Sequence, residues 1–350
     1  MNMKVKKLLL AILISMAASM SFAYDAKING IYYIFSGENA TVTFAYYDSF
    51  KKVPVSDYKG NIVIPSTVTY GGDTYNVTKI GVGAFYHCDD LKSVQIPSSV
   101  VSIQEDAFYS CYDLEKINFA SIADMCKIEY GNFDAYPAND SNTKSHVYAA
   151  GKELKDRLII PKGIKKIKEY SLMNLSLTYL EIPDGLWYVG AYAFCGARAY
   201  HSTIFIGNGR NDYLKIGYRA FAGSGSNVDS HGLVSKILCY SKNPPEYYKP
   251  KDAGGYDTFC FNKNNFENGN TPTVYVLPGC KSRYNNTSNP FWNCNFVEMS
   301  DAMVGIESVD NDENLIGKVY NLNGQRQRKM QKGINIIRFL DGTTKKVLVK

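Results

Sequence analysis

Histidine is scarce in this sequence, and its few copies are not arranged for metal binding. The 350 residues include only His87, His146, His201 and His231, and none is spaced as in His-x-x-x-His. The sequence also lacks a Gly-x-Ser-x-Gly motif, a P-loop and a dinucleotide-binding fingerprint. We therefore expect no enzymatic activity, no cofactor and no metal. A hydrolase that uses Cys126 as nucleophile and His146 as base is the alternative.

The body of the chain also lacks an excess of positive charge. The net charge of +6 comes from the two ends: three lysines lie at positions 4, 6 and 7, and residues 317–350 hold nine basic residues against one acidic residue. Residues 24–316 hold 27 basic and 32 acidic residues, a net charge of −5. A mildly acidic body is not the pattern of a nucleic-acid-binding protein, so we expect no nucleic-acid partner.

A hydrophobic run long enough to cross a membrane is missing too. The apolar run from Leu8 to Ala18 is shorter than the ~20 residues that a membrane helix needs. It follows the three lysines and precedes Ser21 and Ala23, which is the order of a secretory signal peptide. We expect residues 1–23 to be a signal peptide, with an uncleaved anchor as the alternative, and no membrane span after cleavage. The expected location is extracellular or the outer cell surface, and the periplasm is the alternative.

What the chain does contain is a repeat of 23 residues. Residues 80–97 and 103–119 carry apolar or small residues at seven matching positions. A repeat of this length predicts a solenoid of stacked coils. One pair of residues marks each coil and should form a buried spine: Ala84-Phe85, Ala107-Phe108, Ser171-Leu172, Ala193-Phe194, Ala220-Phe221 and Thr258-Phe259.

A short apolar triplet, such as Val94-Gln95-Ile96, predicts one strand in each coil. Period-two alternation turns its first and third side chains into the core and its middle side chain outward. Prolines at positions 65, 97, 161 and 183 should end their strands. We expect the strands to form one parallel sheet, roughly 35 Å long over seven steps of ~4.8 Å. The outward middle residues are the candidate binding face: Val63, Gln95, Asn118, Ile159, Glu181, Phe205, Leu238 and Tyr275.

The last three residues of this candidate face form an apolar run. Exposed apolar patches often mark interaction sites, and tyrosine is enriched at the centres of interfaces. Phe205, Leu238 and Tyr275 therefore favour a protein interface at this end of the face. The alternative is that insertions around Tyr200 and Gly232 cover the patch.

The segments on either side of the repeats predict a cap, an insertion and a tail. Residues 24–79 read as β-hairpins that cap the first coil and include the first repeat strand. Residues 80–300 form the solenoid, and residues 120–157 read as an insertion that begins with a short helix at Ser121. Residues 301–316 have the composition of a linker, and residues 317–350 alternate as a small β segment. The expected fold is thus mostly β, with few short helices.

Eight cysteines in an exported chain would ordinarily suggest disulfides. Cys88 and Cys111, however, occupy one repeat position that Leu175 fills in a later coil, so we expect them to fill space in the core. The pairing of the other six stays open: Cys126, Cys195, Cys239, Cys260, Cys280 and Cys294.

The repeat resembles that of a known family. The phrase Ile-Gly-x-x-Ala-Phe-x-x-Cys-x-x-Leu-x-x-Val-x-Ile-Pro-x-Ser-Val at residues 80–100 is similar to the leucine-rich repeat of the BspA-like surface proteins of Gram-negative anaerobes. Residues 63–70 resemble that family's first module, and residues 241–245 with 274–279 resemble its closing repeat. The last segment is similar to the C-terminal sorting domain of type IX secretion, with a plain hairpin cap as the alternative.

The resemblance implies a secreted or cell-surface leucine-rich-repeat protein that works by protein binding or adhesion. The partners that it implies are host matrix proteins, host cell-surface proteins or other bacteria. With 28 tyrosines, the chain could instead stack on sugars, so a surface glycan-binding protein is the alternative function.

Overall fold

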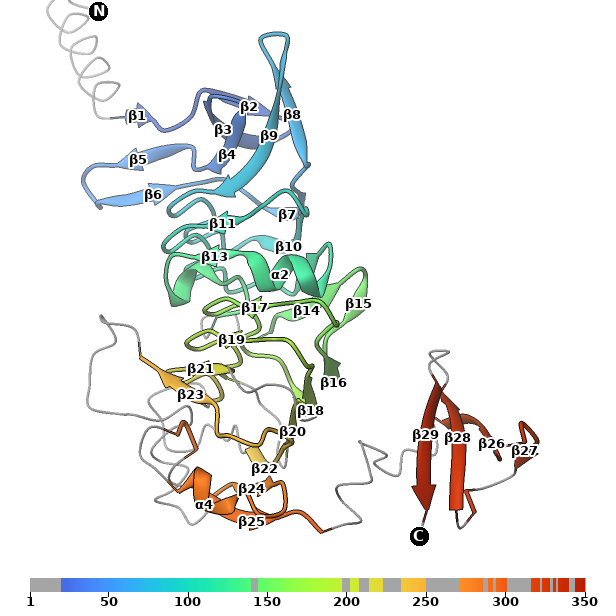
Figure 1. Cartoon of the computed structure of the whole chain (residues 1–350). Helices are drawn as coiled ribbons and strands as arrows, with labels where there is room; N and C mark the ends of the chain where they lie inside the picture. The colour runs from blue at the N-terminus through green and yellow to red at the C-terminus, as the bar shows by residue number, and fades with distance from the viewer. Residues whose placement is uncertain are drawn as a thin grey trace, which may run out of the picture.

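The computed structural model shows a stack of coils (Figure 1) and describes residues 20–139, 144–196, 202–207, 214–222, 234–249, 271–285, 289–291, 294–300, 316–321, 323–327, 330–331, 333–339 and 344–349. Each coil contributes one strand to a front face and one strand to a back face. Coils of this kind bury one continuous core between the two faces. The leucine-rich-repeat solenoid expected from the sequence is therefore confirmed.

The front face consists of two sheets. The five-stranded N-terminal front sheet has the order β15 (Lys152–Glu153), β14 (His146–Ala149), β12 (Lys116–Phe119), β10 (Leu91–Ile96), β7 (Gly60–Val63). The six-stranded C-terminal front sheet has the order β16 (Asp156–Ile159), β18 (Leu177–Ile182), β20 (Ser202–Ile206), β22 (Val234–Cys239), β24 (Thr273–Val276), β25 (Asn295–Glu298). Apart from the β14–β15 hairpin, neighbouring strands are parallel.

The back face is divided at the same level of the stack. The N-terminal back sheet has the order β13 (Glu129–Tyr130), β11 (Ser102–Ile103), β9 (Asp73–Ile80), β4 (Asn39–Thr43), β3 (Ile31–Ser36), β2 (Ala26–Ile28), and β8 (Thr67–Tyr70) pairs with β9. The C-terminal back sheet has the order β17 (Lys166–Ile167), β19 (Tyr188–Val189), β21 (Lys215–Gly217), β23 (Glu246–Tyr248).

The single continuous front sheet that we expected is wrong, and residues 120–157 explain why. This stretch supplies β13 to the back face and β14 to the front face, so it is an expanded coil rather than a simple insertion. After β14 the chain turns back at Gly151, which has a φ of +77°. The returning strand β15 then pairs with the edge of β14 where the next coil would otherwise continue the sheet.

Helices are few, as the sequence indicated. Those of the described residues are α2 (Ile122–Lys127), the 3-10 turn η1 (Phe133–Ala135) and α4 (Lys281–Tyr284). The predicted N-cap is confirmed, because the Ser121 hydroxyl accepts a hydrogen bond of 3.0 Å from the Asp124 N–H. Helix α2 lies on the back face beside β17, where the Lys168 N–H donates to the Cys126 carbonyl at 3.1 Å.

The Ala-Phe pairs form the spine that the repeat predicted. Phe85, Phe108, Leu172, Phe194 and Phe221 are all buried, and the rings of Phe85 and Phe108 stack with centroids 4.8 Å apart. Backbone hydrogen bonds join successive turns, such as the one from the Phe85 N–H to the Ala107 carbonyl at 2.8 Å. Thr258-Phe259 lies outside the described residues.

Left-handed backbone brackets each Ala-Phe turn. The residue before the pair has a positive φ in every described coil: Gly83, Asp106, Tyr170, Tyr192 and Arg219. The third residue after the alanine does so as well: His87, Ser110, Asn174 and Gly196. Only glycine adopts this conformation without cost, so the tight turn is held by the coils packed around it.

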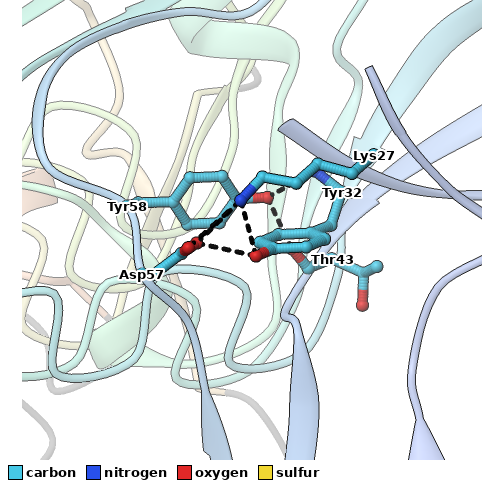
Figure 2. Close-up of polar contacts among 5 residues, drawn as sticks. All are labelled: Lys27, Tyr32, Thr43, Asp57 and Tyr58. Atoms are coloured by element: carbon cyan, nitrogen blue, oxygen red, sulfur yellow. Dashed lines mark hydrogen bonds and ion pairs between the residues drawn. The ribbon is translucent and has the colours of Figure 1, made fainter. Parts of the chain in front are cut away.

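The N-terminal cap consists of the expected hairpins and is bound to the first coil by a polar cluster. Hairpin β3–β4 turns at residues 37–38, and hairpin β8–β9 turns at Gly71 and Gly72. The buried Tyr58 hydroxyl donates to the Thr43 carbonyl at 2.7 Å and accepts from the Tyr32 N–H at 2.9 Å (Figure 2). The Tyr58 ring also lies 4.6 Å from that of Phe85, so it begins the spine.

A second part of the same cluster is charged. Lys27 contacts Asp57 at 3.1 Å and the Tyr32 hydroxyl at 2.7 Å, and the Tyr32 hydroxyl donates to Asp57 at 2.8 Å (Figure 2). Burial opposes ionisation of Asp57, but the hydrogen bonds from Tyr32 and Lys27 outweigh it and lower the pKa of this carboxyl group. The cluster therefore ties β2 and β3 to the segment that leads into β7.

The two ends of the chain lie at the limits of the described residues. Residues 20–22, which we assign to the end of the signal peptide, form β1 (Met20–Phe22) in a small antiparallel sheet with β5 (Tyr46–Asp48) and β6 (Val53–Val55). Residues 1–19 and most of the expected linker, 301–315, lie outside the described residues. The C-terminal segment forms a four-stranded antiparallel sheet in the order β27 (Arg326–Gln327), β26 (Ile316–Tyr320), β28 (Gly333–Phe339), β29 (Thr344–Val349).

Candidate binding face

The outward surface of the N-terminal front sheet carries two straight rows of side chains. Because the strands are parallel and in register, equivalent residues of successive coils lie side by side. One row contains Val63, Gln95, Asn118 and Tyr148. The neighbouring row contains Asn61, Ser93, Lys116 and His146. Every one of these side chains is exposed or half-buried, so the surface is mixed polar with one aliphatic and one aromatic member.

Contacts within and between the rows, and one to the turn after β14, hold several of these side chains in place. The Ser93 hydroxyl donates to the Asn61 side chain at 2.7 Å. The Lys116 ammonium lies 4.8 Å from the centre of the Tyr148 ring, a cation–π contact. The Asn118 side chain accepts from the Gly151 N–H at 3.2 Å, which fixes the turn after β14. The face is therefore partly preorganised, and preorganisation lowers the entropic cost of binding.

An ionic contact closes the C-terminal end of this face. The His146 ring contacts Glu153 at 2.7 Å, and Lys155 contacts the same carboxylate at 3.0 Å. The hydrogen bonds from His146 and Lys155 lower the pKa of Glu153. These groups stand in water at the edge of the hairpin, so they orient one another without contributing much stability.

The structure aligns the predicted candidate residues but divides them between the two front sheets. Val63 and Gln95 are exposed and Asn118 is half-buried in the first sheet. In the second sheet, one column carries Ile159, Glu181, Phe205, Leu238 and Tyr275. Ile159 is exposed, whereas Glu181 and Tyr275 are half-buried.

The prediction that Phe205 and Leu238 are exposed is wrong. Their side chains are 7% and 5% exposed. They point away from the main core, but they pack into a second cluster on the outward surface, made of Tyr179, Phe205, Leu238, Tyr240 and Met299, with Tyr275 and Leu277 against it. The rings of Tyr179 and Phe205 lie 4.9 Å apart.

A signal for this second cluster was present in the sequence. Side chains two residues apart on a strand share one face, and tyrosines occupy two of the outward positions beside the column, among polar ones such as Thr203 and Lys236. Tyr179 lies two residues before Glu181, and Tyr240 two residues after Leu238. In the N-terminal front sheet the same positions hold Asn61, Ser93 and Lys116, so no apolar cluster forms there. Tyr200 and Gly232, the expected source of cover, lie outside the described residues.

The back face carries an aromatic patch that the sequence reasoning missed. Trp187 and Tyr248 are 40% and 41% exposed, and the half-buried Tyr188 lies between them with ring centroids 5.9 Å from each. The Lys166 ammonium lies 4.5 Å from the Trp187 ring. Burial and the hydrogen bond to Glu169 raise the pKa of Tyr188.

Cys126 and His146 do not have the environments of a nucleophile and its base. The Cys126 side chain is buried in α2, and burial raises the pKa of its thiol to about 12. The nucleophilic form is the thiolate, which is scarce at neutral pH for such a group. His146 is exposed at the sheet edge and contacts Glu153. Among the described residues, no group of three or more His, Cys, Asp or Glu side chains could hold a metal ion.

The cysteines of the described coils are thiols. Cys88 and Cys111 are buried at equivalent positions, as the repeat predicted, and the Cys111 sulfur lies 3.0 Å from the Phe85 carbonyl. Five of the six cysteines whose pairing was open are also buried thiols: Cys126, Cys195, Cys239, Cys280 and Cys294. Cys260 lies outside the described residues. Separately, none of the helices in the described part of the chain has the length and apolar character needed to span a membrane.

Comparison with known proteins gives one family. The sequence matches the BspA-type leucine-rich repeat region in six copies, over residues 61–154 and 141–237. These residues include most of the N-terminal front sheet and the coils that follow it. No curated protein matches the chain.

Three solved structures are similar to the chain. A leucine-rich repeat protein from Bacteroides ovatus has 17% identity over 79% of this chain and 67% of that one, with a TM-score of 0.32. A leucine-rich cell-surface protein from Faecalibacterium prausnitzii has 15% identity over 80% and 96%, with a TM-score of 0.26. The pneumococcal vaccine antigen PcpA has 14% identity over 79% and 98%, with a TM-score of 0.19.

Proposed function

The chain belongs to the BspA-type leucine-rich repeat family, and from that premise we propose that it is an exported surface protein that binds other proteins. Its binding site is the outward face of the N-terminal front sheet. The observation that carries the proposal is the pair of aligned, exposed or half-buried rows that include Lys116 and Tyr148. A mixed polar surface with an ordered aromatic side chain fits a protein interface, in which tyrosine is enriched.

The partners we propose are host matrix proteins, host cell-surface proteins or other bacteria. The experiment measures binding of the full chain to immobilised extracellular-matrix proteins and to whole cells. Lys116→Ala combined with Tyr148→Ala should weaken binding about tenfold, because it removes the tyrosine of the two rows and the cation that contacts it. The matched control is Lys236→Ala with Tyr275→Ala, which removes the same kind of cation–π pair, 5.3 Å apart, from the C-terminal front sheet.

Two outcomes would contradict this assignment. One is unchanged binding by the Lys116 and Tyr148 double variant, and the other is an equal loss in the control variant. A thermal denaturation curve for each variant separates lost contacts from lost folding. Side chains of the second outward cluster, such as Phe205, are unsuitable for this test because they are buried.

Export and surface attachment are the cellular part of the proposal. The basic and apolar order of residues 1–23 supports a signal peptide, and the C-terminal β segment supports a role in type IX sorting. A stop codon in place of Lys345 removes most of β29, which pairs with β28 through six residues. We expect this truncation to leave the protein inside the cell envelope. Unchanged surface exposure in fractionated cells would reject the sorting role and leave a plain cap.

A surface glycan is the second candidate ligand, and the back-face aromatic patch favours it. Exposed rings can stack on the apolar faces of sugars, while Glu169, Lys215 and Glu246 border the rings with hydrogen-bonding groups. A glycan array probed with the full chain should lose its signal on Trp187→Ala or Tyr248→Ala. A silent array, together with retained binding to matrix proteins, would reject this candidate. We propose no catalytic role for Cys126 and His146.

A further inference from the structure

The two faces of the solenoid end differently at the N-terminal cap. On the back face the cap continues the sheet, since β9 pairs with β4, β4 with β3, and β3 with β2. On the front face the sheet stops at β7, whose one partner among the described strands is β10 (Figure 1). An uncovered edge is unusual, because proteins normally cover, charge or shorten such strands to prevent pairing with other chains.

Alternation along β7 decides which backbone groups face this open edge. The Gly60 N–H donates to the Asp90 carbonyl at 2.8 Å, and the Ile64 N–H donates to the Gln95 carbonyl at 3.1 Å. Residues of that parity face β10, so the backbone groups of Asn61 and Val63 point away from the sheet. No other backbone group of the described residues is bonded to them. The Val63 side chain lies on the outward face of the same sheet and is 60% exposed.

A groove of about 330 Å³ lies beside this edge. Val63 and Pro65 line it from the end of β7, and the cap lines the opposite wall. The wall consists of Ile28, Asn29, Ile31 and Tyr33 around strands β2 and β3, and Thr67, Val68 and Thr69 of β8. The inner lining is aliphatic and aromatic, while the threonines and Asn29 form a polar rim. This volume is at the lower end of the range for ligand sites and is suited to one or two side chains.

We propose that the edge of β7 accepts an extended peptide segment of a partner protein as an additional strand. The Val63 N–H and the Asn61 carbonyl bond the peptide backbone, and one β-branched apolar side chain of the peptide fills the groove. Addition of a strand to a sheet edge draws affinity from main-chain hydrogen bonds and specificity from pockets for alternate side chains. The site is the edge of the sheet and its groove, so it is additional to the outward face proposed above, with which it shares Val63.

A single peptide segment fits this site better than a second solenoid. Strand β7 offers four residues, and the cap stands across the groove from it. A narrow, extended segment enters between them, whereas a second copy would have to bring an entire sheet edge past the cap. The short contact also implies weak binding, with a dissociation constant in the micromolar range or above.

The test removes one backbone donor and leaves the side-chain surface nearly unchanged. Val63→Pro deletes the outward N–H at a sheet edge, where proline is tolerated. Val63→Thr is the matched control, since it keeps the N–H and the β-branched shape. Immobilised full-length protein selects from a phage-displayed library of random heptapeptides, and the enriched peptide is then titrated by fluorescence anisotropy against each variant.

We expect wild type and Val63→Thr to enrich peptides with alternating β-branched residues, and Val63→Pro to bind them at least tenfold more weakly. N-methylation of alternate peptide amides should abolish binding with every side chain unchanged. Thr67→Arg, which fills the groove from its exposed rim, should also weaken binding. Thr74→Arg is its control, because Thr74 lies on the same hairpin and does not line the groove.

Three results would overturn the proposal. The first is a library that yields no peptide with wild type, and the second is a peptide whose affinity is unchanged by Val63→Pro. The third is concentration-dependent dimerisation that Val63→Pro abolishes, which would show that a second copy binds at the edge. Unchanged thermal midpoints confirm that the variants fold. Binding to matrix proteins through Lys116 and Tyr148 is measured separately, so failure at the edge is distinguishable from failure of the proposed face.

Discussion

Phe85 and Phe108 hold equivalent places in neighbouring coils, and both side chains are fully buried. The two rings stack on each other, and Tyr58 packs against Phe85 from the cap. A change at either residue therefore disturbs an interface between coils. In a linear array, where each coil contacts only its neighbours, that loss is not compensated elsewhere.

We predict that Phe108→Ala lowers the free energy of unfolding by about 3–5 kcal/mol, because it removes a buried ring and leaves a cavity. The control is Phe50→Ala, in a turn of the cap where the ring is 88% exposed, which should change stability by less than about 0.5 kcal/mol. Urea unfolding followed by circular dichroism measures both. Equal effects of the two substitutions would contradict the buried spine.

The charged part of the cap cluster makes stability depend on pH. The folded-state pKa of Asp57 is lowered, so its contribution is present above the unfolded value of about 3.9 and is lost as the pH falls through the folded value. Asp57→Asn should be less stable than wild type at pH 7 by at most about 1 kcal/mol, since the Asp57 side chain is 65% exposed. The difference should begin to fall near pH 4 and vanish once the pH lies below the lowered folded-state pKa. A difference that persists at low pH would contradict the ionic contribution.

Burial controls the chemistry of the thiols. Burial raises the pKa of Cys88, Cys126 and Cys294 to about 12, so almost no thiolate is present at neutral pH. We predict that N-ethylmaleimide leaves these three cysteines unmodified in the native protein and modifies them all in urea. Peptide mapping by mass spectrometry reads out each site. Rapid native labelling of Cys126 would instead revive it as a candidate nucleophile.

At the level of residues, the sequence predicted the direction in which a strand side chain points, but it did not predict how far that side chain is exposed. Alternation alone turned Phe205 and Leu238 away from the main core, which the structure agrees with. They pack against Tyr179 and Met299, which come from other coils, and against Tyr240, which lies two residues after Leu238; these side chains gather only after the strands pair. The positions beside Gln95 are polar, so Gln95 is exposed in the first sheet, whereas Phe205 and Leu238 are buried in the second.

Glycines on the back face set how closely coils approach. Gly190 and Gly217 follow the inward residues Val189 and Ile216 of β19 and β21. A Cβ atom at Gly190 would lie 2.5 Å from the Glu169 backbone nitrogen, and one at Gly217 would lie 2.4 Å from that of Ala191. Both distances are below van der Waals contact, and the obstructing atoms belong to the backbone. The stack can admit a side chain there only if two coils separate.

We predict that Gly190→Ala lowers the free energy of unfolding by about 1–3 kcal/mol, through the clash between neighbouring coils. Gln104→Ala is the matched control, because Gln104 occupies the equivalent place after Ile103 of β11. It should be nearly neutral. Chemical unfolding compares the two, and a neutral Gly190→Ala would show that the coils are less closely packed at this position.

At the level of elements, the repeat period predicts the strands of coils that keep the regular length. It does not predict the strands of a coil whose length differs. The strands of regular coils and their ends before proline followed from the repeat. Strand β14 did not, because α2 and η1 lengthen its coil and displace the expected triplet. The hairpin at Gly151 then ends the sheet, which is a matter of edge geometry that no local pattern describes.

Both faces of the whole molecule are interrupted between the same coils. The front sheets divide between β15 and β16, and the back sheets between β13 and β17. Across this junction the described contacts include the Lys168 N–H to Cys126 carbonyl bond at 3.1 Å and the Asn174 side chain to Ala138 carbonyl bond at 2.6 Å. Elsewhere, continuous ladders join the coils. The junction is therefore the weakest interface of a linear array.

We predict that Met125→Ala, in the buried face of α2 at this junction, divides unfolding into two transitions. Wild type should unfold in one, because coupling across each interface holds the array together. Hydrogen exchange with mass spectrometry should then show residues 24–154 and 156–300 exchanging as separate blocks. A single transition in the variant, with one exchange rate throughout, would contradict a weak junction.

For the molecule as a whole, the repeat in the sequence was sufficient for the solenoid and the identity of its outward columns. The sequence did not predict which end of the front face presents exposed side chains, because that depends on which outward side chains are covered after the strands pair. The open edge of β7 and its groove were equally hidden. Both arise where the cap meets the first coil, and the cap carries no copy of the repeat.

Strands that lie across the stack give the protein a particular response to force. Hydrogen bonds between coils run along the long axis, so a pull on the two ends loads one ladder at a time instead of all ladders together. Each coil of 23 residues that peels away lengthens the chain by roughly 80 Å. Under such a pull the solenoid would act as an extensible tether, with the junction beside α2 as the first part to yield.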